Sequence, residues 1–262
     1  MSSAAITAVV VLESPRNAPD SPKTIFFDGQ IYQGAGQPLL AAFRYFNANN
    51  MVFDDVGFYF LHATVAKMAE GAVILPSESD IVYDLVGDIV FLIPAPDVDP
   101  KYLPWVHITG TVCATPSSLK DTFDINASQY TSALRDAKKH GGSTLPVRCF
   151  VKDSPKYKQY SKPVPNVNSQ VTFTGSLTSV DRNADDGTPE YFRLEVDSVT
   201  FMGKAAVPAK PSPAPASNSQ TPAKRKPKYN WSSESPTPVK RSKPDADKNS
   251  AASASSSQTS TN

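Results

Sequence analysis

Ten short apolar runs, spread over residues 4–201, constrain the fold of this chain more than any other feature. Each run is rich in β-branched and aromatic residues, and Gly, Pro, Asn or Asp separates one run from the next. This composition is typical of β-strands, because such side chains pack well on a pleated sheet. The runs cover Ala4–Glu13, Thr24–Tyr32, Leu39–Phe46, Gly57–Lys67, Ile81–Ile93, Trp105–Ala114, Thr122–Ser128, Leu145–Lys152, Gln170–Val180 and Tyr191–Phe201. We therefore predict an all-β fold.

A proline-rich segment separates the first five runs from the last five. It contains Pro94, Pro96 and Pro100, and proline cannot donate the backbone hydrogen bond that a sheet needs. We expect a β-rich domain over residues 1–95, a hinge over residues 96–103 and a second β-domain over residues 104–203. The alternative is that the two sets of strands share one core.

Apolar residues alternate with polar ones in the second set of runs, which is the period of a half-buried strand. In the run from Gln170, the alternation points Val171, Phe173 and Leu177 towards the core. The same pattern assigns an inward position to Val106, Ile108, Val112, Phe123, Ile125 and Ala127. A helix is predicted from Tyr130 to Ala137, before a pair of glycines that would end it.

The second set also has the features of a small barrel. It has five short strands, with a glycine in the first and another in the fourth, and glycine lets a strand bend at a barrel corner. Residues 104–203 therefore resemble the oligonucleotide/oligosaccharide-binding (OB) barrel family, and more loosely the barrels of replication protein A. The predicted helix departs from this family, because it lies between the second and third strands instead of the third and fourth.

A second resemblance covers a shorter part of the chain. The segment Arg148–Pro165, together with Val171–Val180, is similar to a stretch found in uncharacterised multicopy proteins of mushroom-forming fungi. This resemblance implies a fungal source and carries no activity.

The third strand of the second set provides the candidate binding surface. If Val147, Cys149 and Val151 face inward, the residues between them face solvent as an aromatic ring flanked by two cations. Such an arrangement suits single-stranded nucleic acid, whose bases stack on rings while its phosphates contact Lys and Arg. The predicted nucleic-acid-binding residues are Arg148, Phe150, Lys152, Lys156, Tyr157, Lys158, Tyr160 and Lys162. The alternative is that Phe150 is covered, and that Tyr157 and Tyr160 attach a proline-rich loop to the barrel.

The charges are distributed unevenly along the chain. Residues 1–103 hold 5 basic and 12 acidic residues, residues 104–203 hold 11 and 10, and residues 204–262 hold 10 and 3. The last segment consists largely of Pro, Ser, Ala, Thr and Asn, with too little apolar surface to offset the entropy cost of folding. We expect residues 204–262 to be a disordered basic tail that attracts polyanions in a salt-dependent way.

Two basic clusters in this tail have the spacing of a two-part nuclear import signal. They are formed by Lys224, Arg225, Lys226 and Lys228, and by Lys240, Arg241 and Lys243. We therefore predict nuclear localisation, with a nuclear import receptor as one partner.

No catalytic or metal-binding pattern is recognisable. The three histidines have no ligand spacing to one another or to cysteine, and no nucleophile elbow, phosphate loop or dinucleotide fingerprint is present. Two cysteines in a chain of this length favour a reducing compartment over a disulfide framework. No apolar run approaches the ~20 residues that span a bilayer. We expect no enzyme activity, no cofactor, no metal and no membrane association.

Taken together, the sequence predicts a nuclear protein that binds single-stranded DNA or RNA weakly through an OB-like barrel and a basic tail. The alternative is a protein–protein interaction module that uses the β-domains as a scaffold, since exposed aromatic residues serve that role equally well.

Overall fold

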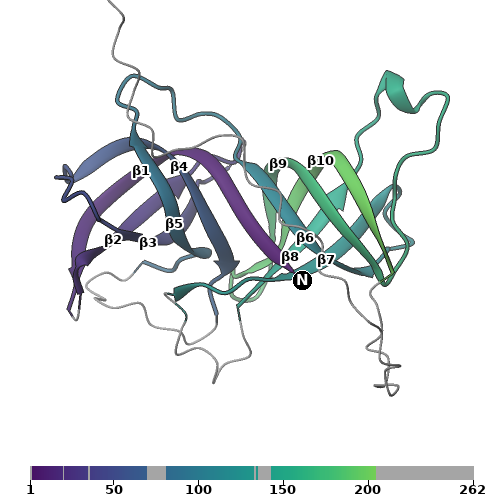
Figure 1. Cartoon of the computed structure of the whole chain (residues 1–262). Helices are drawn as coiled ribbons and strands as arrows, with labels where there is room; N and C mark the ends of the chain where they lie inside the picture. The colour runs from purple at the N-terminus through teal and green to yellow at the C-terminus, as the bar shows by residue number, and fades with distance from the viewer. Residues whose placement is uncertain are drawn as a thin grey trace, which may run out of the picture. The chain divides into compact units, whose positions relative to one another are not determined.

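The computed structural model describes residues 2–19, 21–34, 36–69, 81–132, 134 and 143–204. These residues belong to one compact unit (Figure 1). The tail beyond Lys204, with its predicted disorder and both import clusters, lies outside the described residues. Most of the predicted helix from Tyr130 to Ala137 lies outside them as well.

The all-β prediction is confirmed, because ten strands make up most of the described residues and the helical content there is limited to short 3₁₀ turns. The strands are β1 (Ser3–Ala18), β2 (Ser21–Ile31), β3 (Leu39–Phe46), β4 (Val56–Lys67), β5 (Leu85–Pro94), β6 (Trp105–Ala114), β7 (Thr122–Ser128), β8 (Thr144–Phe150), β9 (Ser169–Arg182) and β10 (Pro189–Lys204). One 3₁₀ turn, η2 (Pro155–Tyr157), lies between β8 and β9. Each predicted run overlaps one strand, and the two largest differences are at β1, which ends at Ala18 instead of Glu13, and at β5, which begins at Leu85 instead of Ile81.

The first five strands form a closed circuit of pairings. β1 pairs with β2, β2 with β3, β5 with β4, and β4 with β1, all antiparallel. β3 and β5 close the circuit as a parallel pair. Figure 1 shows these strands in purple and blue, wrapped around a common interior.

The last five strands repeat this circuit in the same order. β6 pairs with β7, β7 with β8, β10 with β9, and β9 with β6, all antiparallel. β8 and β10 are the parallel pair. We call strands β1–β5 the first set and strands β6–β10 the second set.

The two sets are joined by main-chain hydrogen bonds and by apolar packing. The segment Ser3–Thr7 of β1 pairs antiparallel with Trp105–Thr109 of β6, so that the ten strands form one continuous sheet. One hydrophobic cluster includes residues of both sets, among them Ile6, Leu85 and Phe192. The residues between β5 and β6 contain no strand, in the position of the predicted hinge.

The predicted inward residues of the second set are buried. Val106, Ile108, Val112, Phe123, Ile125, Ala127, Val147, Cys149, Val151, Val171, Phe173 and Leu177 are each no more than 3% exposed. Period two therefore predicted the core of this set correctly, because side chains on a strand alternate between its two faces.

The two glycines predicted in strands of the second set, Gly110 and Gly175, lie at close contacts. A Cβ on Gly175 of β9 would overlap the backbone carbonyl of Glu195 on β10, and one on Gly110 would meet the Ile125 side chain at 2.7 Å. A larger residue would require the β10 backbone to shift at Gly175 and the Ile125 side chain to move at Gly110.

The connection that follows β7 covers part of the first set. Leu134 is 4% exposed and packs with Phe26, Ala42 and Val86 on the outer side of β2, β3 and β5. The backbone amide of Ser132 also donates to an Asp88 carboxylate oxygen at 2.5 Å. This side of the first set is therefore occupied by the chain itself.

Candidate nucleic-acid interface

The predicted surface on β8 faces away from the core, as expected. Val147, Cys149 and Val151 are buried, while Arg148 and Phe150 are half-buried and Lys152 is exposed. Phe150 lies between Thr122 of β7 and Glu195 of β10 in the strand register. Part of its ring is thus covered by neighbouring strands, and the remainder is accessible.

Arg148 is engaged by carboxylates. Its Nε and Nη2 each donate to Asp124 at 2.9 Å, as a bidentate pair. Its Nη1 lies 3.6 Å from Asp181, and its guanidinium stacks on the Tyr191 ring with the Cζ atom 3.9 Å from the centroid. The hydrogen bonds that it donates to Asp124 raise the pKa of Arg148 above its usual value. Because the Asp124 side chain is only 4% exposed, this pair is a structural element of the face.

The other two cations at the ends of the predicted surface differ in accessibility. Lys152 forms an ion pair with Glu195 at 3.2 Å, but most of its side chain remains in solvent, where such a pair contributes little. Lys162 lies within 2.8 Å of Asp121 and of the Val151 carbonyl, and 2.7 Å from Asp153. The hydrogen bond to Asp121 raises the pKa of Lys162. Lys162 therefore holds its loop against the end of β8 and against Asp121, the residue before β7.

The segment between β8 and β9 presents the accessible part of the predicted site. Tyr160 is 74% exposed, and Lys156 and Lys158 are also exposed. In the part of the chain that the structure describes, neither lysine forms an ion pair, and the Lys156 ammonium lies 5.4 Å from the centre of the Tyr157 ring. Tyr157 itself packs partly against the core, as the alternative interpretation of this residue predicted.

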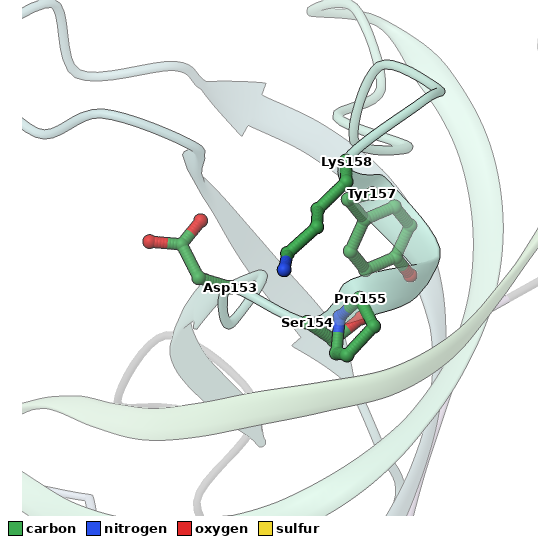
Figure 2. A pocket seen from close by; sticks show the side chains of 5 residues that line it. All are labelled: Asp153, Ser154, Pro155, Tyr157 and Lys158. Carbon is green, nitrogen blue, oxygen red and sulfur yellow. The ribbon is translucent and has the colours of Figure 1, made fainter.

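A small recess lies at the base of this segment. It has a volume of about 360 Å³ and is lined by Asp153, Ser154, Pro155, Tyr157 and Lys158. In Figure 2 the Lys158 side chain extends into the space between the Asp153 carboxylate and the Tyr157 ring. The recess therefore combines one aromatic ring, one ammonium group and one carboxylate.

Three further residues share the outer face of the second set and were not part of the predicted site. Asp181 of β9 and Tyr191 and Arg193 of β10 lie beside Arg148. The alternation of Phe192 and Leu194 as inward residues was the available signal, since it directs Tyr191 and Arg193 outward. Their proximity to β8 depends on the parallel pairing of β8 with β10, which no local pattern indicates.

The outer face of the first set is different in character. Phe58, Phe60, Phe91 and Ile93 are each at least 36% exposed, and the rings of Phe60 and Phe91 meet edge to face with centroids 5.8 Å apart. In the register, Phe60 lies between Val9 of β1 and Ile93 of β5. From Ala5 to Val11 on β1, and from Val56 to Thr64 on β4, no outward residue is charged. We call this the apolar face.

A larger cleft of about 610 Å³ lies between loops of the two sets, and two of its charged groups, Arg182 and Asp84, are engaged with each other. Arg182 donates to both carboxylate oxygens of Asp84 at 2.6 and 2.9 Å, and also to the Gly187 carbonyl. The Asp84 side chain is 7% exposed. This pair connects the two sets instead of presenting a free charge to a ligand.

Catalytic and metal-binding groups are not brought together among the described residues. No three His, Cys, Asp or Glu side chains in this part of the chain are placed to hold a metal ion. Cys113 and Cys149 are both free, and burial raises the pKa of each thiol, which opposes nucleophilic activation. Across the same residues, no helix has the length and apolar character needed to cross a bilayer.

Comparison with known proteins adds no further assignment, because neither a family model nor a curated protein sequence matches this chain.

Proposed function

We propose that the protein is a non-enzymatic, nuclear single-stranded nucleic-acid-binding protein built from two OB-type barrels. The closed five-strand circuit, present twice with a parallel third and fifth strand, supports this assignment. Small barrels of this type bind oligonucleotides on their outer surface and loops. We assign binding to the second barrel, because its β8–β9 segment places exposed lysines close to an exposed tyrosine.

The observation that carries the proposal is the composition of the β8–β9 segment. Lys156, Lys158 and Tyr160 are exposed there within five residues. A base can stack on the Tyr160 ring while neighbouring phosphates meet the two ammonium groups, and such stacking contributes about 1–3 kcal/mol per base. Lys152 lies at the start of the segment and extends the cationic surface.

The basic tail, residues 204–262, adds nuclear import and non-specific phosphate attraction to this site. Its two basic clusters supply the nuclear import signal, and its net positive charge attracts the phosphate backbone without base preference. A fluorescent fusion in which both clusters are changed to alanine tests the compartment. Loss of nuclear accumulation is expected, and unchanged accumulation would remove this part of the proposal.

Binding is tested by anisotropy of a fluorescein-labelled oligothymidylate with the full chain. We expect the double variant Lys156→Ala, Lys158→Ala to bind roughly 3–10-fold more weakly, with a salt dependence that is shallower by about 0.7 per lost phosphate contact. Tyr160→Ala should weaken binding without changing the salt dependence, because stacking is not an ionic contact.

The matched control is the double variant Lys23→Ala, Lys101→Ala. It removes the same charge from exposed positions of the acidic half of the chain. An equal loss of affinity in the two double variants would show that only net charge matters, and the β8–β9 segment would not be the binding site.

Protein binding is the second candidate function, and the apolar face favours it. Exposed, contiguous apolar surface of this kind commonly marks an interaction site. Since no outward residue of β1 or β4 on this face is charged, a second copy of the chain can meet it without like-charge repulsion, in a symmetric contact. We therefore propose a second copy as its occupant.

A further inference from the structure

Two arginines of the second set converge on one carboxylate. Arg148 on β8 and Arg193 on β10 are direct partners in the parallel register, and both point away from the core. Arg148 Nη1 lies 3.6 Å from one oxygen of Asp181, and Arg193 Nε lies 3.6 Å from the other. Asp181 thus bridges two guanidinium groups on neighbouring strands.

The bridge is loose compared with the adjacent ion pair. Arg148 binds Asp124 at 2.9 Å in a bidentate geometry, whereas both contacts to Asp181 exceed hydrogen-bond distance. The Nε of Arg193 is covered from solvent and has no hydrogen-bond partner. The two arginines together carry more N–H donors than one planar carboxylate can accept. The Asp181 carboxylate therefore leaves the Arg193 Nε donor without a hydrogen bond.

The charges around this position balance only while Asp181 is present. Asp124 and Asp181 offset Arg148 and Arg193, and the nearby Lys152 is paired with Glu195. Asp181 is 32% exposed and Arg193 is 43% exposed, so solvent and ligands reach both. Asp124, in contrast, is enclosed and stays with Arg148.

We propose that Asp181 occupies a phosphate site, and that a backbone phosphate of single-stranded nucleic acid competes with it for Arg148 and Arg193. A phosphodiester offers acceptor oxygens in a tetrahedral array and forms strong charge-assisted hydrogen bonds with guanidinium groups. The accessible parts of the Tyr191 and Phe150 rings lie beside the pair on the same face, which favours a nucleic acid over another phosphate-bearing ligand. This inference rests on the proposed function and adds a second contact to it.

We expect the Asp181 carboxylate to weaken the binding of nucleic acid, because it competes with phosphate for the two arginines. Removing its charge leaves the arginine pair with one uncompensated positive charge, so binding should tighten. A residue with a purely structural role would have the opposite or no effect on affinity.

The test is the full-length Asp181→Asn variant, titrated with the same labelled oligothymidylate. We expect its affinity to rise roughly 3–10-fold at low salt and its salt dependence to steepen by about 0.7 for each phosphate gained. The matched control is Asp185→Asn, which makes the same charge change at an exposed turn residue without an ion pair to either arginine. Its affinity should stay within about twofold of the unchanged chain.

Arg193→Gln combined with Asp181→Asn should abolish the gain, because one of the two guanidinium groups is then missing. If Asp181→Asn fails to fold by circular dichroism, Asp181→Ser replaces it. A gain no larger than that of Asp185→Asn, or one that survives Arg193→Gln, would overturn the inference. Tighter binding of a phosphoserine peptide without tighter binding of oligothymidylate would also overturn it, because the ligand class would be wrong.

The outcomes for this site and for the β8–β9 segment are separable. If the unchanged chain binds through Lys156 and Lys158 but Asp181→Asn gains nothing, only the present inference fails. If the lysine variants lose no affinity but Asp181→Asn gains affinity, the β8–β9 segment is not the binding site, whereas phosphate binding by Arg148 and Arg193 is supported. If no variant binds oligothymidylate, both fail.

Discussion

The two sets of strands have the same circuit of pairings but opposite outer surfaces. β4 of the first set presents Phe58 and Phe60 to solvent with no charged residue between them. β8 and β10 of the second set present arginines, each facing a carboxylate. The inward side chains of each strand form the core, whereas the outward side chains face solvent and can differ between the two sets. Equal topology therefore does not imply an equal function for the two sets.

One arrangement is nevertheless shared by the two surfaces. In the first set Arg16 forms a bidentate pair with Asp28, which also accepts a hydrogen bond from the Tyr83 hydroxyl at 2.5 Å. In the second set Arg148 forms a bidentate pair with Asp124 and stacks on Tyr191. Both carboxylates are nearly covered, so each pair fixes neighbouring strands in its own set.

Replacing Arg148 is expected to have the largest effect on this comparison. Arg148→Ala leaves the enclosed Asp124 carboxylate without its partner and should lower the free energy of unfolding by about 3 kcal/mol. Phe60→Ala on the apolar face should cost about 1 kcal/mol, because the ring is already partly in solvent. Urea denaturation of both variants measures the difference, and equal losses would contradict the contrast between the two faces.

A charge on the apolar face should have the next largest effect. If a second copy occupies this face, sedimentation should show concentration-dependent association, which Phe60→Glu weakens more than tenfold, or by about 1.4 kcal/mol. High salt should leave the association nearly unchanged, since no ion pair contributes. Thr174→Glu adds the same charge to the outer face of β9 and serves as the control. A chain that is monomeric at all concentrations would rule out this occupant.

Acid should have the smallest effect, through Asp28. Burial raises the pKa of Asp28, but the hydrogen bonds from Arg16 and Tyr83 outweigh burial and lower the pKa below its ordinary value. The folded state therefore binds this proton less tightly than the unfolded state. Its stabilisation is complete above about pH 4 and is lost as the pH falls through the lower folded-state value.

Unfolding midpoints measured between about pH 5 and pH 2 test this prediction against Asp28→Asn. The variant should be less stable near neutral pH and should lose less stability on acidification. An identical acid profile for the two chains would show that Asp28 does not contribute.

The sequence was sufficient to predict the strands and the core of the second set, because alternation is a local property. Phe173 and Cys149 are buried as their spacing requires. The closure of each circuit was harder to predict from the sequence, because the parallel pairs join segments that are far apart in the chain. The sequence predicts too early a start for β5, because Ile81 and Val82 continue the apolar run without pairing in the sheet.

The candidate site was predicted only in part, for the same physical reason. Alternation correctly directs Arg148 outward, but its ion pairs depend on Asp124 and Asp181 from two other strands. Lys162 resembles a free loop cation in sequence, although three acceptors surround it. Local patterns indicate which face a side chain occupies, whereas its electrostatic partners depend on tertiary pairing.

The pairing of Ser3–Thr7 with β6 has a consequence for any ligand that contacts both sets. Domains on a flexible linker can adjust their separation to the polymer that they bind. Here a backbone ladder fixes that separation, so an oligonucleotide that reaches both sets must match a preset length. For such a ligand, affinity should therefore rise in one step when its length first spans both sets, and not gradually with each added nucleotide.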